Sequence, residues 1–287
     1  MTGLDVSKYQ GTGNDFVMLL DLEGRRPLSA ALAAALCDRR TGVGADGAIR
    51  VAPDPDGADV FMDYRNADGS LAEMCGNGIR CVAAFLADRG HGREELTVGT
   101  RAGRRTVTTE LIDGRVASAT VGMGAPDLDA ARVLMRDASG LFLGRSFSVG
   151  GRDFTASAVS MGNPHLVLLL DGPADDELVG TAGPAIERDA RFPEGVNVEF
   201  VTVVGADLVA RVWERGIGET RACGTGACAA LVAANEAGLV DATATVRFPG
   251  GDLLVERAAD QVYLTGTAER SFDATIPTSW LHERGLA

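Results

Sequence analysis

The stretch Met74-Cys75-Gly76-Asn77-Gly78-Ile79-Arg80-Cys81 determines how this chain is organised, because the chain contains a second copy of it. The copy, Ala222-Cys223-Gly224-Thr225-Gly226-Ala227-Cys228, lies half a chain length further on. In both, a Cys-Gly-x-Gly turn opens an apolar run that ends at a glycine, Gly90 or Gly238. A glycine-rich turn before an apolar run predicts a helix that carries the cysteine at its start. The sulfur then lies beside unpaired N–H groups and the positive end of the helix dipole, which favour a thiolate.

The same plan is repeated on either side of the two cysteine turns. A polar, glycine-containing turn leads into a buried strand in each half, Gly11–Asp15 into Phe16–Leu20 and Ser160–His165 into Leu166–Leu170. Alternation and apolar runs predict further elements. These are a helix over 28–37 and strands over 48–51, 60–64, 96–98, 105–112, 115–121, 196–204, 208–213, 243–248, 253–256 and 261–265. The sequence therefore predicts an α+β protein of two duplicated, pseudo-symmetric domains.

The pattern of strands is interrupted between Met123 and Asp127, where we expect the domain boundary. The first domain is expected to span residues 1–121, and the second residues 122–266. The C-terminal segment 267–287 is expected to return to the first domain, and the active site to lie in the cleft between the domains. Two equivalent helix starts would then meet at one site.

Composition excludes several classes of function. With 46% hydrophobic and 23% charged residues the chain is typical of a globular protein, and a net charge of −13 argues against nucleic acid and membrane surfaces as partners. The only lysine is Lys8, which lies in neither a Schiff-base nor a P-loop context, so we expect no cofactor. The first ten residues lack the pattern of an export signal and five cysteines is an odd number, so we expect reduced thiols and a cytoplasmic protein.

Two helix-terminal cysteines on a pseudo-twofold axis suit one kind of chemistry. Inverting a stereocentre by proton exchange needs a base on one face of the carbon and an acid on the other. A thiolate and a thiol can exchange these roles, and we expect such a thiol to titrate near physiological pH. Backbone N–H groups of Gly76, Asn77, Gly224 and Thr225 would face the negative charge that develops on the substrate, each contributing ~3 kcal/mol.

Six segments in the same order resemble the diaminopimelate epimerase family, along the whole chain. They are Gly11-Thr12-Gly13-Asn14-Asp15-Phe16, Asn66-Ala67-Asp68-Gly69, Met74-Cys75-Gly76-Asn77-Gly78, Ser160-Met161-Gly162-Asn163-Pro164-His165, Val196-Asn197, and Glu214-Arg215-Gly216 with Glu219-Thr220-Arg221-Ala222-Cys223-Gly224-Thr225-Gly226-Ala227.

The resemblance implies a fold of two barrel-like domains, each around a central helix, and a cofactor-independent interconversion of LL- and meso-diaminopimelate. It implies that Cys75 and Cys223 are the acid/base residues, assisted by His165 and Glu214. The groups implied to hold the small-molecule substrate are Asn14, Asn66, Asn163, Asn197, Glu214 and Arg215. The assembly is left open, with a homodimer among the options.

Two positions depart from the family pattern, and three other interpretations compete. Gly47 replaces a glutamine that is common in the family, and Thr225 replaces a serine.

The competing functions are a racemase of proline or hydroxyproline type on the same fold, and a protein in which Cys75 and Cys223 form a regulatory disulfide. A zinc site with His165 is disfavoured because the cysteine spacings are too wide, so we expect no metal. The remaining cysteines, Cys37, Cys81 and Cys228, are predicted to lie in the core.

Overall fold

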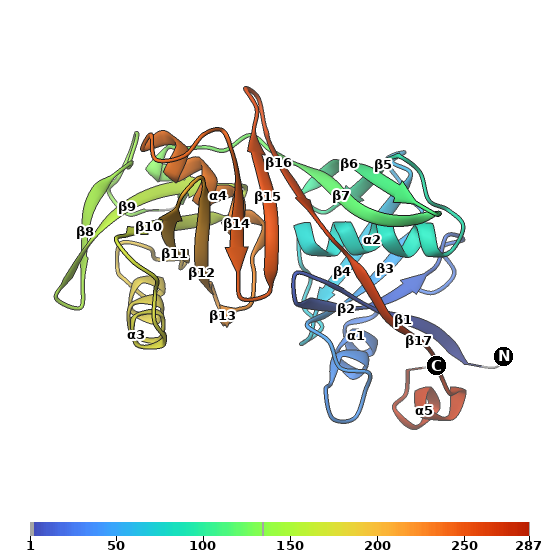
Figure 1. Cartoon of the computed structure of the whole chain (residues 1–287). Coiled ribbons are helices and arrows are strands. Elements are labelled where there is room, and N and C mark those ends of the chain that lie inside the picture. The colour runs from blue at the N-terminus through green and yellow to red at the C-terminus, as the bar shows by residue number, and fades with distance from the viewer. Residues whose placement is uncertain (1–2, 134, 287) are drawn as a thin grey trace. The chain divides into compact units, whose positions relative to one another are not determined.

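The computed structural model describes residues 3–133 and 135–286 (Figure 1). The chain forms two compact units, here called unit 1 (Met1–Val121 with Gly266–Ala287) and unit 2 (Gly122–Thr265). Each unit is an open, curved sheet with one helix on its inner side and another on its outer side.

Unit 1 contains strands on both sides of the first cysteine turn and one strand from the C-terminal segment. The strands are β1 (Leu4–Gly11), β2 (Asn14–Leu20), β3 (Gly47–Ala52), β4 (Val60–Asn66), β5 (Glu95–Thr100), β6 (Gly103–Ile112), β7 (Arg115–Gly124) and β17 (Glu269–Ile276). The helices are α1 (Ala30–Cys37), α2 (Gly76–Asp88) and α5 (Thr278–Glu283). The strands pair in the order β17, β1, β2, β3, β4, β5, β6, β7. Only β2–β3 and β4–β5 are parallel among these pairs.

Unit 2 repeats this order. Its strands are β8 (Arg145–Val149), β9 (Arg152–Ser160), β10 (Pro164–Leu170), β11 (Asn197–Val204), β12 (Asp207–Glu214), β13 (Gly218–Thr220), β14 (Thr243–Phe248), β15 (Gly251–Arg257) and β16 (Val262–Gly266). Its helices are the short 3-10 helix η1 (Ala130–Val133), α3 (Asp176–Glu187) and α4 (Gly224–Glu236). The pairing order is β8, β9, β10, β11, β12, β14, β15, β16, with β10–β11 and β12–β14 parallel. The predicted duplication is confirmed, and β17 takes in unit 1 the place that β8 takes in unit 2.

The helices that follow the cysteine turns lie inside the curve of each sheet. In Figure 1, α2 lies between the β6–β7 hairpin and strands β1–β4, and it contacts β1, β2, β6 and β17. Helix α4 contacts β9–β12, β14 and β15. Both are buried along almost their whole length, as expected for helices enclosed by a sheet. Helices α1 and α3 pack on the outer side, where apolar clusters around Leu36 and around Ile186 form further core layers.

Local chemistry explains the elements that the sequence predicts. The cysteine turns start α2 and α4, the hairpin turn Asp113-Gly114 joins β6 and β7, and the glycines Gly90 and Gly238 follow the two helices with positive φ. The sequence patterns do not predict strand β1, the strand pair β8–β9 or helix α3. Strands β1 and β9 each pair with a strand on both sides, so their sequences lack the clear alternation of a half-buried strand. Pro184 interrupts the helical pattern of α3.

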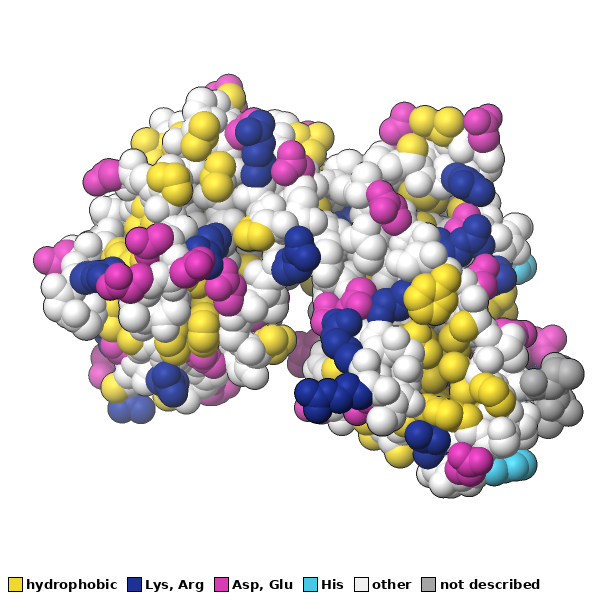
Figure 2. Space-filling view, turned by 60° about the horizontal axis from the view of Figure 1, so that its bottom comes forward, with side chains coloured by type: hydrophobic (Ala, Val, Ile, Leu, Met, Phe, Trp, Pro, Cys, Tyr) yellow, Lys and Arg dark blue, Asp and Glu magenta, His cyan; other side chains and the backbone are white. Residues whose placement is uncertain are grey.

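The visible surface carries acidic and basic side chains intermixed, without a continuous basic face (Figure 2). Within the described part of the chain, no helix has both the length and the hydropathy needed to cross a bilayer.

Candidate functional site

Both cysteines occupy the N-cap position of an inner helix, as the turn chemistry predicts. Cys75 caps α2, and its Sγ accepts a hydrogen bond from Gly78 N at 3.4 Å. Cys223 caps α4, and its Sγ accepts from Gly226 N at the same distance. Each sulfur therefore lies where the helix leaves N–H groups free and its dipole is positive. The two half-sites are equivalent in backbone geometry.

The sheet registers bring the other predicted residues to the same end of each sheet as the cysteine. In unit 1, Phe16 pairs with Gly47, and Gly47 pairs with Asn66. In unit 2, His165 pairs with Asn197, and the β11–β12 register sets Asn197 beside Glu214. The equivalent positions are thus Phe16 and His165, Gly47 and Asn197, and Asn66 and Glu214. Asn14 lies two residues before Phe16, and Asn163 lies two residues before His165.

In the half-site of unit 1, an amide side chain lies beside the sulfur. Cys75 Sγ lies 3.6 Å from Asn14 Oδ1, and Asn14 Nδ2 donates to Asp46 at 2.7 Å. Asn66 closes its own turn by donating to Ser70 Oγ at 3.0 Å. Cys75 itself is half-buried. The Asn14 amide therefore links this thiol to the carboxylate of Asp46.

Behind Cys75, a fully buried arginine connects the two glycine-rich turns of unit 1. Arg80 Nη2 donates to Thr12 Oγ1 at 2.7 Å and to Asn77 Oδ1 at 3.0 Å. The Asn77 side chain is thus engaged within unit 1. Sequence reasoning did not single out Arg80, because an arginine inside an apolar helix gives no local signal of its partners.

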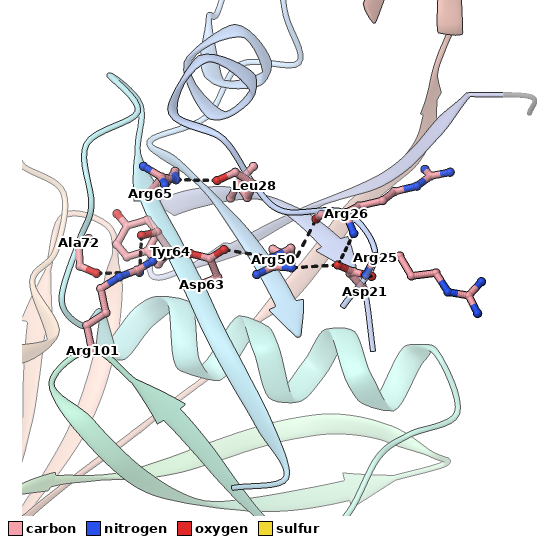
Figure 3. Close-up of polar contacts among 10 residues, drawn as sticks. All are labelled: Asp21, Arg25, Arg26, Leu28, Arg50, Asp63, Tyr64, Arg65, Ala72 and Arg101. Atoms are coloured by element: carbon pink, nitrogen blue, oxygen red, sulfur yellow. Dashed lines mark hydrogen bonds and ion pairs between the residues drawn. The ribbon is translucent and has the colours of Figure 1, made fainter. Parts of the chain in front are cut away.

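A second arginine network fixes the segment that precedes Cys75 (Figure 3). Asp63, in β4, accepts from Arg50 Nε at 3.1 Å and from Arg101 Nη2 at 2.5 Å. Arg101 also donates to the backbone oxygens of Tyr64 and Ala72, at 3.1 Å and 3.4 Å. Because these two residues flank the turn that contains Asn66, the network holds that turn against the sheet.

The half-site of unit 2 contains ionisable side chains that are joined by hydrogen bonds. His165 is fully buried, with Nδ1 2.7 Å from Glu199 Oε1 and Nε2 3.0 Å from Asn163 Oδ1. Asn163 Nδ2 donates to Thr225 Oγ1 at 3.3 Å, and Thr225 Oγ1 lies 3.4 Å from Cys223 Sγ. A continuous path of hydrogen bonds therefore leads from Glu199 to the sulfur. Glu199 was missed by sequence reasoning, and only the register with β10 reveals its position beside His165.

Two further predicted residues define the outer part of this half-site. Asn197 Nδ2 donates to Pro164 O at 2.9 Å, and its Oδ1 accepts from Arg215 N at 2.9 Å. Both ends of this amide are thus engaged within unit 2, and they fix the turn that carries Arg215. The Arg215 side chain is exposed, and its Nη1 donates to Glu194 O at 3.3 Å.

Burial and charge determine the protonation of this half-site. Burial raises the pKa of the Cys223 thiol well above its usual value, and the carboxylates of Glu214 and Glu199 raise it further. The expectation that a helix-terminal thiol titrates near physiological pH is therefore wrong for Cys223, because burial and two acidic neighbours outweigh the helix dipole. Burial also raises the pKa of Glu214, against the lowering effect of its hydrogen bond from Thr220.

The position of the substituted family glutamine is closed by its neighbours. A Cβ on Gly47 would lie 2.4 Å from Tyr64 Cε2 and 2.6 Å from the backbone oxygen of Arg65. Tyr64 packs edge-on against Phe16, with ring centroids 5.7 Å apart. The glycine is therefore required here by the close approach of β4.

The other cysteines lie in the core, as the sequence predicts. Cys37, Cys81 and Cys228 are buried, and burial raises the pKa of Cys37 and of Cys81 to about 12. His91 and His282 are exposed. Among residues 3–133 and 135–286, no three His, Cys, Asp or Glu side chains are grouped as metal ligands.

The family model of diaminopimelate epimerase matches residues 6–128 and 157–271, including both cysteine turns. The chain belongs to the diaminopimelate epimerase family. Three similar members come from Desulfitobacterium hafniense (42% identity, covering 95% of this chain and 98% of the relative), Mycobacterium avium (44%, covering 96% and 97%) and Synechococcus sp. strain JA-3-3Ab (45%, covering 95% and 98%). Each is named diaminopimelate epimerase.

Solved structures with the same fold are more distant from this family member. A phenazine biosynthesis protein of the PhzF family from Bacillus anthracis has a TM-score of 0.67 and 16% identity, covering 96% of this chain and 99% of the other. A hydroxyproline epimerase from Agrobacterium vitis has a TM-score of 0.63 and 16% identity, covering 96% and 91%. At this identity the likeness concerns the fold, which confirms the predicted α+β class with two related barrel-like domains.

Proposed function

We propose that this chain interconverts LL- and meso-diaminopimelate by moving a proton on and off one α-carbon, with Cys75 and Cys223 as the two acid/base residues. The observation that carries the proposal is that a member of this family places a cysteine at the N-cap of the inner helix in both of its duplicated units. Two equivalent thiols suit a reaction that must run in both directions.

In the proposed reaction one cysteine acts as a thiolate and removes the α-proton, so that the C–H bond breaks and an S–H bond forms. The electron pair moves into the substrate carboxylate, where the N–H groups of the first turns of α2 and α4 can stabilise it. The thiol of the other cysteine then delivers its proton to the opposite face of the carbon. The reverse reaction exchanges the two roles, and the proton count is unchanged.

The resting protonation follows from the surroundings of the two sulfurs. Because burial, Glu214 and Glu199 all raise the pKa of Cys223, we assign the thiol form to Cys223 in the ligand-free protein. Cys75, which is half-buried and lies 3.6 Å from the Asn14 amide oxygen, is assigned as the base that the first substrate meets. The ammonium group of a bound substrate would pair with Glu214 and weaken its effect on Cys223.

The remaining side chains suit the ends of an amino acid. Glu214 suits an ammonium group, and the exposed guanidinium of Arg215 suits a carboxylate in two-pronged geometry. We assign the amides of Asn14, Asn66 and Asn163 to the same substrate groups, with Asn197 and His165 fixing the positions of others. We further propose that the two domains enclose the substrate between them, and that the protein works without a cofactor in the cytoplasm, where thiols stay reduced. A homodimer is compatible with this assignment.

The test compares turnover of LL-diaminopimelate with that of L-proline and examines both cysteine variants. We expect turnover on the first substrate alone, and its loss by at least ~100-fold in Cys75→Ala and in Cys223→Ala while both variants remain folded. Turnover of L-proline would instead assign the chain to the racemases of this fold. Full activity in either variant would overturn the two-thiol mechanism.

A further inference from the structure

Glu199 is a buried carboxylate in the core of unit 2, and its burial is unfavourable for stability. Its side chain is completely buried on β11. One oxygen, Oε1, lies 2.7 Å from His165 Nδ1, whereas Oε2 accepts no hydrogen bond within the described structure. A buried carboxylate that leaves one oxygen unsatisfied is costly, and an apolar side chain of similar volume generally serves a core as well or better.

The duplication supplies an internal comparison for this position. Glu199 lies two residues beyond Asn197, and Ile49 lies two residues beyond the equivalent Gly47. A Cβ on Gly226, in the first turn of α4, would lie 2.7 Å from Glu199 Oε1. A Cβ on Gly78, in the first turn of α2, would lie 2.9 Å from Ile49 Cδ1. Glu199 and Ile49 therefore occupy the same place beneath the cysteine-capped turn.

The partner of Glu199 differs in the same way between the units. His165 is equivalent to Phe16 by register, and both are fully buried. Unit 1 thus fills this part of its core with Phe16 and Ile49, and unit 2 fills it with His165 and Glu199. The same fold accepts an apolar pair here, so the charged pair in unit 2 is not required by folding.

The contacts of His165 show what the charged pair does. A carboxylate and an amide oxygen are both acceptors, so the two contacts are satisfied together when Nδ1 donates to Glu199 and Nε2 donates to Asn163 Oδ1. The contact between Nε2 and Oδ1 fixes the orientation of the Asn163 amide, so that its Nδ2 faces Thr225 Oγ1. The Thr225 hydroxyl, which already accepts from Asn163, is left to donate its proton toward Cys223 Sγ.

We propose that Glu199 is a positioning residue for acid/base chemistry at Cys223, acting through His165, Asn163 and Thr225 to aim a hydroxyl donor at the sulfur. The inference rests on the proposed function of Cys223 and adds a residue to it. Glu199 itself touches neither the sulfur nor, in this assignment, the substrate. Unit 1 lacks this device, which makes the two thiols chemically unequal although their backbones match.

The first test is spectroscopic and does not depend on turnover. The chain has three histidines, and the two besides His165 are exposed, so selective 15N labelling of the histidine rings gives three pairs of signals, two of which serve as an internal control. We expect both ring nitrogens of His165 to carry slowly exchanging protons in the unaltered protein. Glu199→Gln should change the protonation pattern of His165 and leave His91 and His282 unchanged. An unchanged His165 signal would overturn the proposal.

The second test is kinetic, with LL-diaminopimelate as the substrate. Glu199→Gln keeps the side-chain shape, and we expect kcat to fall by about 10- to 100-fold with KM changed less than about threefold, as for residues that orient a functional histidine. Glu256→Gln, on the exposed side of β15, serves as the charge-matched control and should keep full activity. Full activity of Glu199→Gln would overturn the proposal.

The third test asks whether Glu199 acts through His165. In the double variant Glu199→Gln with His165→Gln, the loss of kcat should equal that of His165→Gln alone, because both changes remove one device. Losses that multiply would contradict the proposed path. If the unaltered protein fails to turn over diaminopimelate while the 15N result holds, the proposed function fails and the positioning of His165 by Glu199 stands.

A fourth variant copies unit 1 into unit 2. The double substitution His165→Phe with Glu199→Ile should fold cooperatively, because unit 1 has this pair at the equivalent place, and should lose activity to the level of His165→Phe alone. Loss of cooperative folding would assign the charged pair to the core of unit 2 and overturn the proposal.

Discussion

His165 occupies in unit 2 the position that Phe16 occupies in unit 1: each is fully buried near the start of the third strand in the pairing order of its sheet, two residues after an asparagine. The duplicated fold therefore supplies two equivalent cysteine turns but surrounds them with different chemistry. In unit 1 the equivalent position holds a buried apolar ring. An imidazole paired with a carboxylate lies beside Cys223. In the proposed mechanism, this inequality between equivalent sites sets which thiol holds the proton.

The two thiols should differ in their reactivity toward an alkylating reagent. Only the thiolate reacts, and every pKa unit lowers its population about tenfold at a given pH. Since the pKa of Cys223 is raised and Cys75 is the more exposed residue, we expect iodoacetamide at neutral pH to modify Cys75 at least ~10-fold faster. Peptide mass spectrometry over time measures both rates. Faster modification of Cys223 would contradict the assignment of the resting thiol.

Replacing Glu214 by glutamine should raise the stability of the protein at pH 7 and lower its activity. A group with a raised pKa in the folded state stabilises the protein fully below its unfolded pKa of ~4.3, and this contribution is lost as the pH rises through the folded value. The ionised carboxylate is thus unfavourable at pH 7, and Glu214→Gln should unfold at a higher urea concentration there.

The same variant should lose at least ~100-fold in kcat/KM if Glu214 holds the substrate ammonium. The stability gain should vanish below pH ~4, where both side chains are neutral. Glu256→Gln provides the control for a surface charge change. A Glu214→Gln protein that is less stable than the unaltered one at pH 7 would show that the ionised carboxylate is well accommodated.

A methyl group at position 47 should destabilise the protein, whereas one at position 180 should stabilise it. Gly47→Ala places Cβ against the Tyr64 ring and the Arg65 carbonyl, and such overpacking costs about 1–3 kcal/mol. Gly180 lies inside α3, where an added Cβ would meet no atom within 4 Å, so Gly180→Ala should gain about 0.5–1 kcal/mol. Urea denaturation compares both. A Gly47→Ala protein of unaltered stability would show that β4 can move away.

Stability should fall at alkaline pH because of the buried thiols in the core. The pKa of Cys37 and of Cys81 is raised to about 12, so their contribution is complete below the unfolded value of ~8.5 and is lost as the pH rises toward 12. Each thiol should cost roughly 1.4 kcal/mol per pH unit within that window. Urea denaturation at pH 8 and pH 10.5 should show a smaller decrease for Cys37→Ala with Cys81→Ala. Equal decreases would contradict the raised values.

The part of the site that depends on local chemistry is predictable from the sequence. A Cys-Gly-x-Gly turn before an apolar run places a thiol at a helix start whatever the rest of the chain does, and both N-caps are confirmed. The fold class follows from finding that turn twice. Neighbouring strands and helix α1 are predicted by the same local patterns.

The rest depends on which strands pair and in what register. Glu199 lies within an apolar strand, and its histidine partner is remote in sequence, so nothing near it indicates a role. The same holds for Arg80, whose partner Thr12 belongs to another turn. Strand β1 is not predicted because its pairing with β17 joins the two ends of the chain. The raised pKa of Cys223 likewise requires knowledge of its burial and of Glu214 and Glu199.

The most direct test of the two-thiol mechanism is the fate of the α-proton when LL-diaminopimelate reacts in deuterated water, measured by NMR and mass spectrometry before equilibrium is reached. Two separate acid/base residues predict that the meso product carries one deuterium at the inverted carbon, while the recovered LL substrate still carries protium there. A product that retains protium at the inverted carbon would show that one group both removes and returns the proton, and would contradict the account.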